Sequence, residues 1–141
     1  MKAISIRAPW WWFILHAGKD IENRDWKHSY RGPVLIHASS WWKEREVRDD
    51  ATAARDLAGH TAAFRFPSID TFRGDMRRLG GHIVGRAEIV GCVRSSDSPW
   101  FVGDYGFVLK NVQPLPIPFL CTGALGFFDV RWAPDADLTA P

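Results

Sequence analysis

The sequence is poor in cysteine: its 141 residues include only Cys92 and Cys121, which are far apart in the chain. The five histidines show no His-x-x-x-His spacing and no neighbouring cysteine pair, so a structural zinc site is not expected. We expect no metal and no other cofactor. Two isolated thiols suit a reducing compartment, although the two could still pair, and we therefore expect a cytoplasmic protein.

The sequence also lacks an apolar run long enough to cross a membrane. The run from Ala8 to Ala17 is about ten residues, half of what a transmembrane helix needs, so no membrane partner is expected. Arg7 interrupts the apolar stretch that a signal peptide would require, and we expect the N-terminus to belong to the mature protein. A net charge of +2 falls well short of the strongly basic balance of a dedicated duplex-DNA binder.

What the sequence has in excess is tryptophan, with eight residues. Indole rings are costly to expose, so they either fill the core or line a cleft where flat ligands stack. We assign Trp12, Trp42 and Trp132 to the core. We expect Trp100 to be the best stacking residue, because its Ser-Pro-Trp loop offers few neighbours in sequence to bury it.

The composition is that of an ordinary globular protein, with 46% apolar and 24% charged residues, and we place one domain at residues 1–132 and a flexible tail at 133–141. Period-two patterns predict strands, and helical spacing predicts helices. The expected strands are 2–7, 34–38, 82–94, 105–115 and 123–132; the expected helices are 9–17, 41–57 (stopped by Gly59) and 68–79 (capped by Ser68). We predict an α+β fold, a small β-barrel of about five to six mostly antiparallel strands with flanking helices.

A dense polar segment, residues 19–26, follows the first expected helix. The first 32 residues hold six Lys or Arg against three acids, so this part of the chain is cationic. On an extended segment Glu22 and Arg24 share one face. An ion pair of Glu22 with Arg24 or Lys19 that merely locks a loop fits this pattern as well as a functional site does. We interpret His37, on its strand, as a satisfied core or edge residue.

Three stretches near the N-terminus carry a pattern that resembles a known family. They are residues 5–10 (Ser-Ile-Arg-Ala-Pro-Trp), 18–24 (Gly-Lys-Asp-Ile-Glu-Asn-Arg) and 30–39 (Tyr-Arg-Gly-Pro-Val-Leu-Ile-His-Ala-Ser). Together with residues 85–90, 97–100, 105–107 and 123–128, they resemble the ASCH family, small relatives of the PUA RNA-binding domain. The resemblance runs from Met1 to about Val130. It implies a PUA-like β-barrel with a helix-flanked cleft, whose floor carries the Gly-Lys-x-x-Glu-x-Arg motif.

The resemblance also implies an association with RNA or nucleosides. Some members of the family deacylate N4-acetylcytidine, and this sequence is similar to them at Lys19 and Arg24. Those hydrolases have threonine where this chain has Glu22, and a further catalytic glutamate of theirs has no clear counterpart here.

Recognition of RNA or a modified nucleoside is our first hypothesis. Cationic groups would meet phosphates or a base edge, and tryptophans would stack on an unpaired base. The candidate binding residues are Trp10, Lys19, Arg24, Trp26, Arg31, Ser39, Ser98 and Trp100. Single-stranded RNA suits this better than a duplex, because splayed bases can enter a cleft.

Catalysis is the alternative. Lys19 or Glu22 would accept a proton and Arg24 would stabilise an oxyanion, in hydrolysis of an acylated base or cleavage of an RNA phosphodiester. Ser39 and Ser98 are the only loop-edge hydroxyls that we would name as nucleophiles. A third possibility is a regulatory module that binds a peptide on its tryptophan-rich surface. The oligomeric state does not follow from the sequence.

Overall fold

The computed structural model describes residues 1–40, 43–61 and 67–132. Trp42 and the tail at 133–141, for which the sequence predicts burial and flexibility respectively, lie outside this described part. The chain runs β1 (Lys2–Ile6), α1 (Trp10–His16), β2 (Ile21–Arg24), β3 (Gly32–Ala38), α2 (Glu44–Thr61), α3 (Ile69–Leu79), β4 (His82–Val93), β5 (Tyr105–Leu120) and β6 (Phe127–Asp129). No helix within the described ranges has the length and apolar character needed to span a bilayer.

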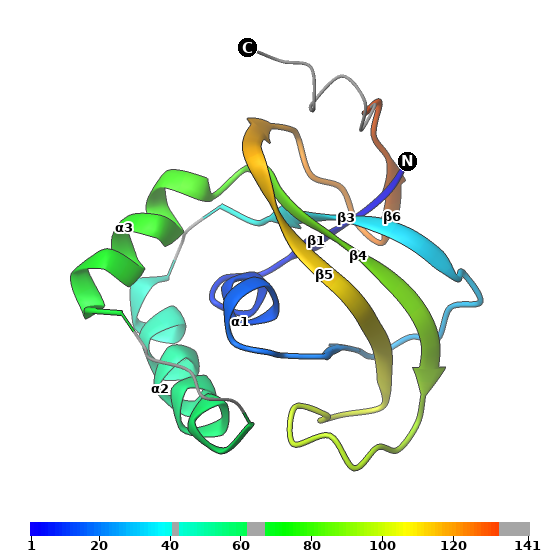
Figure 1. Ribbon diagram of the computed structural model, residues 1–141, viewed down its shortest axis with the longest axis horizontal. Coiled ribbons are helices and arrows are strands. Elements are labelled where there is room, and N and C mark those ends of the chain that lie inside the picture. The colour runs from blue at the N-terminus through cyan, green and yellow to red at the C-terminus, as the bar shows by residue number, and fades with distance from the viewer. Residues whose placement is uncertain (41–42, 62–66, 133–141) are drawn as a thin grey trace.

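The six strands form one mixed sheet in the order β2-β5-β4-β3-β1-β6. β1 pairs with β3 in parallel, Ile4 opposite Ile36, and the other four neighbouring pairs are antiparallel. The sheet curls into a half-barrel around α1 (Figure 1). The predicted α+β fold with a barrel-like sheet is thereby confirmed. Register shifts along β4, near Gly85 and Gly91, let this long strand bend with the sheet.

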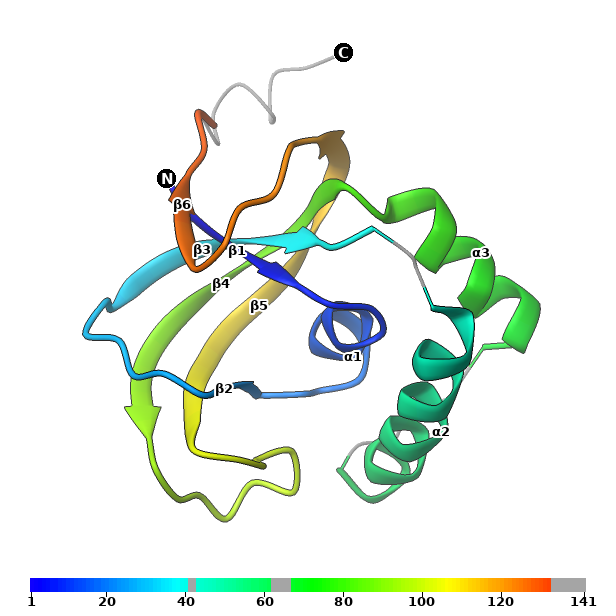
Figure 2. The same ribbon diagram turned by 180° about the vertical axis from the view of Figure 1, so that it is seen from behind.

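The helix α1 lies inside the curve of the sheet. The helices α2 and α3 lie on the other side of α1, away from most of the strands (Figures 1 and 2). This placement buries two of the three tryptophans of α1. Trp12 is 4% exposed, which confirms its predicted place in the core, and Trp11 is 0% exposed, whereas Trp10 is only partly buried. The reason is that α1 is covered on more than one side: the Trp12 ring meets Phe72 of α3 at 5.1 Å between centroids.

The helices α3 and α2 agree with the sequence to different degrees. α3 begins where it was predicted, and α2 ends later than predicted. Ser68 caps α3 as predicted, and its hydroxyl accepts a hydrogen bond from the amide of Thr71. The helix α2 continues past Gly59 to Thr61, because a glycine lowers helix stability without forbidding the helical conformation.

The last two strands differ from their predicted bounds. β5 is longer than expected and includes Pro114, and β6 is shorter than the predicted 123–132. Trp132, assigned to the core, is only partly buried at the edge of a second apolar cluster, where the guanidinium of Arg86 lies 5.8 Å from its ring centroid. It covers that edge because the chain leaves the sheet after Asp129.

Candidate functional site: a charged cleft beside the half-barrel

The polar segment after α1 contains a strand that the sequence pattern did not reveal. β2 pairs antiparallel with β5, with Glu22 opposite Phe107 and Arg24 opposite Tyr105. Side chains two apart on a strand point to the same face, so Glu22 and Arg24 lie together. Ile21 is 2% exposed and joins the main core, which fixes the register of this short edge strand.

Lys19 is placed by the turn that ends α1. Gly18 has a φ of +74°, a conformation that favours glycine, and the turn returns the amide of Lys19 to the carbonyl of Phe13 at 3.2 Å. The lysine is 3% exposed, and its ammonium donates to the carbonyl of Ile21. It also lies 5.7 Å from the ring centroid of Trp10. Desolvation by burial lowers the pKa of Lys19, a shift that the Glu22 carboxylate opposes.

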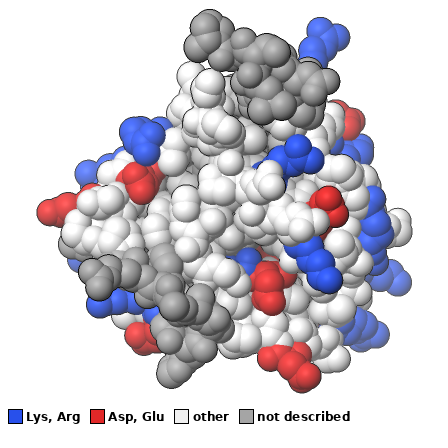
Figure 3. Space-filling view, viewed as in Figure 1, with Lys and Arg blue, Asp and Glu red and all other residues white. Residues whose placement is uncertain are grey.

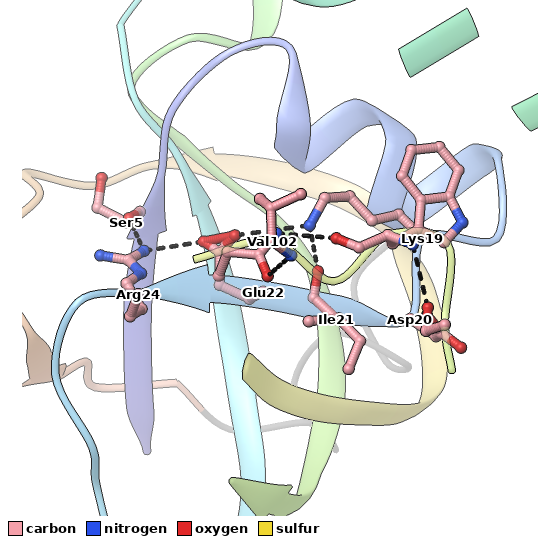
Figure 4. A network of polar contacts seen from close by, with 10 residues as sticks. Ser5, Lys19, Asp20, Ile21, Glu22, Arg24 and Val102 are labelled. Atoms are coloured by element: carbon pink, nitrogen blue, oxygen red, sulfur yellow. Dashed lines mark hydrogen bonds and ion pairs between the residues drawn. The ribbon is translucent and has the colours of Figure 1, made fainter. Parts of the chain in front are cut away.

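Glu22 lies between the two cations of the motif. One carboxylate oxygen accepts from the Arg24 guanidinium at 3.0 Å, and the other lies 3.9 Å from the Lys19 ammonium. The same Arg24 nitrogen donates to the carbonyl of Ser5 on β1 at 2.8 Å. Figure 4 shows the three charged side chains in a row along β2. The ion pairs that the sequence allowed are therefore present, and they are buried rather than exposed: Glu22 is 7% exposed.

The charged row lies in a cleft of about 660 Å³, which we call the main cleft. It is lined by Ser5, Ile6, Arg7, Trp10, Lys19, Glu22, Asn23, Arg24, Asp25, Trp26, Ser39, Leu57, Trp100 and Val102. The structure therefore brings together seven of the nine candidate site residues of the sequence, from α1, β2 and four connecting segments. The polar segment faces a hollow, as the binding hypothesis required.

Two candidates lie elsewhere. Arg31 donates to the carbonyls of His28 and Tyr30, within its own turn, and faces a different hollow. Ser98 donates to the carboxylate of Asp20 at 2.6 Å and thereby fastens the loop before β5. Neither residue lines the main cleft.

Trp100 lines the main cleft, but the expectation that its loop leaves it exposed is wrong. The residue is 3% exposed, and its ring lies 6.1 Å from that of Phe13 in α1. The loop is pulled inward by Asn23, whose side chain donates to the Trp100 carbonyl at 2.9 Å and accepts from the Val102 amide at 3.0 Å. Trp10 and Trp26 also line the main cleft and are only partly buried, so more of their ring surface is accessible than that of Trp100.

A hydrogen-bonded chain that includes Ser5 and Ser39 of the cleft lining went unrecognised in the sequence. The carbonyl of Cys121 can only accept, so the His37 Nε2 that lies 2.7 Å from it carries a proton. Burial lowers the pKa of His37, which keeps its Nδ1 unprotonated as the acceptor for the Ser5 hydroxyl at 2.8 Å. The Ser39 hydroxyl then donates to Ser5 at 2.8 Å. This agrees with the interpretation of His37 as a satisfied residue. The parallel pairing of β1 with β3, which sets Ser5 opposite His37, brings these side chains together.

The site as built offers hydrogen-bond donors, positive charge and flat apolar surfaces to one ligand. Two cations surround one carboxylate, so the row carries an excess positive charge whenever Lys19 is protonated. Across the described residues no group of three or more His, Cys, Asp or Glu is arranged to hold a metal ion.

The family model for the ASCH domain matches residues 4–102, a range that includes the whole of β2 and Trp100. The search of curated proteins found no match. Because the family match covers most of the chain, the protein belongs to the ASCH domain family, whose members are generally RNA-associated or hydrolase-like.

Proposed function

We propose that the protein binds single-stranded RNA or a modified nucleoside, with one unpaired base in the main cleft. The observation that carries this proposal is the convergence of Trp10, Trp26 and Arg24 on a single hollow of about 660 Å³. That volume lies in the usual range of small-ligand sites. Both tryptophans are partly buried, so each offers a ring face and loses little further side-chain conformational entropy when a base stacks on it.

The charges of the cleft favour a ligand rich in acceptors. The Arg24 side chain is 21% exposed, so donors of its planar guanidinium remain accessible beside those used by Glu22 and Ser5. A base edge or a phosphate matches such a fork of donors. Asp25, also in the lining, supplies an acceptor for amino groups of a base.

The test is a binding measurement with RNAs of about eight nucleotides, the span of a typical single-strand site, and with free nucleosides including N4-acetylcytidine. Isothermal calorimetry at two salt concentrations should detect binding that weakens as salt rises. Arg24→Lys keeps the charge but loses the planar fork, and should weaken binding about tenfold. The matched control is Arg86→Lys, on β4 and outside the lining of the main cleft. Absence of binding at low salt, or equal affinities for the two variants, would remove the proposal.

Hydrolysis of an acylated base is a second candidate, and one observation favours it. Lys19 is buried beside Glu22, and its burial lowers its pKa, so its neutral form, which can accept a proton from water, is reached at a lower pH than in an exposed lysine. Arg24 would stabilise the oxyanion that forms when this water attacks the acyl carbon. The proton on Lys19 would then pass to the departing amine.

An assay on N4-acetylcytidine and other acylated nucleosides tests this second candidate. Glu22→Gln preserves the shape of the side chain but removes the charge beside Lys19, so the pKa of the lysine should fall further and the pH–rate profile should move to lower pH. Because the base form of Lys19 is the neutral amine, the rate should rise with pH until the lysine is deprotonated. A purified wild type with no turnover, or a profile that Glu22→Gln leaves unmoved, contradicts the role of Lys19.

A further inference from the structure

A second hollow, of about 570 Å³, lies at the end of β4 and β5, and we call it the basic hollow. It is lined by Lys27, His28, Ser29, Arg31, Cys92, Arg94 and Tyr105. Three of these side chains are cationic and none is acidic. Figure 3 shows Lys and Arg side chains gathered along the edge of the molecule where the β2–β3 connection and the end of β4 lie.

The cationic side chains of the basic hollow, Lys27, Arg31 and Arg94, are exposed and are not neutralised by acidic neighbours among the described residues. Arg31 donates only to carbonyls of its own turn among the contacts of the described residues, which holds it in place without neutralising it. Arg94 lies 5.9 Å from the ring centroid of Tyr105, so a flat aromatic surface and a positive charge occur side by side. None of the ion pairs between described residues includes Lys27, Arg31 or Arg94.

The basic hollow and the main cleft adjoin each other along one short stretch of chain. Trp26 lines the main cleft, and its ring meets that of His28, which lines the basic hollow, at 5.7 Å between centroids. The strands join them as well: Arg24 of the main cleft lies directly opposite Tyr105 of the basic hollow in the β2–β5 register. A ligand that leaves the main cleft past Trp26 therefore reaches the cations at once.

We infer that the ligand is a polynucleotide rather than a free nucleoside, with one base in the main cleft and the adjoining phosphates over Lys27, Arg31 and Arg94. This inference rests on the proposed function and deepens it by naming the class of ligand. Clustered cations without acids match a phosphodiester backbone, which presents one negative charge per nucleotide. Tyr105 gives a second base a stacking surface, the combination used by single-strand binding sites.

The experiment compares two double variants with equal loss of charge. Lys27→Ala with Arg94→Ala removes two cations of the basic hollow, and Arg48→Ala with Lys110→Ala removes two cations that are also exposed but line neither hollow. All four side chains are exposed, so both proteins should fold, and circular dichroism checks this. The probes are a mixed-sequence RNA of about eight nucleotides and free nucleosides, each measured over a salt series.

Each phosphate contact on a single strand contributes about 0.7 to the slope of log affinity against log salt. Lys27→Ala with Arg94→Ala removes two such contacts, so this variant should have a slope that is shallower by about 1.4. Its nucleoside affinity should stay at the wild-type value, and the control variant should match the wild type with both probes. Equal RNA slopes for the two variants would overturn the inference. If Arg24→Lys still weakened RNA binding in that case, the proposed function would stand without it.

Two further outcomes are also decisive. Wild-type protein that binds neither RNA nor nucleoside would remove the proposed function and this inference together. A glutamate-rich peptide of the same charge that competes with the RNA at equal concentration would show that the basic hollow recognises charge alone, and would overturn the assignment of a polynucleotide.

Discussion

Replacing Arg24 with methionine tests whether the charged row is a buried network or a solvated surface. The substitution leaves the Glu22 carboxylate, in a residue that is 7% exposed, with only the Lys19 ammonium at 3.9 Å. Removing one partner of a buried ion pair costs about 3–5 kcal/mol, because the other charge is left uncompensated. Since Arg24 is 21% exposed and Lys19 remains, we expect the lower end, about 3 kcal/mol.

The assay is urea unfolding followed by circular dichroism. A small domain has a total stability of about 5–15 kcal/mol, so a loss of about 3 kcal/mol is large and should lower the midpoint by about 1–3 M urea. The control is Lys2→Met, which breaks the Lys2–Asp129 pair. That pair is similarly short at 3.1 Å, but its side chains are 40% and 78% exposed, so the loss should stay below about 1 kcal/mol.

The double variant Glu22→Gln with Arg24→Met separates charge from packing. It removes the uncompensated carboxylate, so it should be more stable than Arg24→Met alone. The reasoning is refuted if Arg24→Met costs no more than Lys2→Met, because the carboxylate of Glu22 would then be solvated and the main cleft would be an open exterior face.

Three further changes follow from the site. Lys19→Met should raise stability relative to wild type near neutral pH. The unfolded chain binds a proton at Lys19 that the folded protein, with its lowered lysine pKa, holds less tightly. The free energy of unfolding of the wild type therefore increases as pH rises from the folded-state pKa of Lys19 to the ordinary lysine pKa. Urea titrations should show the difference in stability between Lys19→Met and wild type closing over this range. A difference that does not depend on pH contradicts the burial argument. Gly106→Ala should cost about 1–3 kcal/mol in the same assay, because the added Cβ would lie 2.8 Å from atoms of both Ile21 and Phe101; an unchanged midpoint would show that these side chains yield freely. Trp100→Ala should lower the free energy of unfolding by about 3–5 kcal/mol in the urea assay, as expected for a buried aromatic ring; a loss below about 1 kcal/mol would indicate an exposed ring.

The fold could be predicted from the sequence where a segment has one buried face. β4 follows its period-two pattern from His82, and α3 follows its helical pattern from the Ser68 cap. β2 escaped notice because its four residues carry three polar side chains, and its strand conformation is imposed by pairing with β5. Local propensity has little influence on such a segment when tertiary pairing decides the outcome.

The site could be predicted in part for the same reason. The spacing of Glu22 and Arg24 predicted that the two share one face, and their places on β2 agree with this. The burial of Trp100 and the chain from Ser39 to His37 depend on contacts between residues far apart in sequence. No local pattern contains that information.

Asn23 holds the loop before β5 by two hydrogen bonds, and this affects how the ligand selectivity of the protein could be altered. One amide side chain holds both the Trp100 carbonyl and the Val102 amide, and both contacts are made to main chain. The side chain of Val102, which is 61% exposed, is therefore free to be exchanged while the backbone keeps its path. The rim of the main cleft can be reshaped at that position with the charged floor left intact, which makes Val102 the natural starting point for engineering altered selectivity.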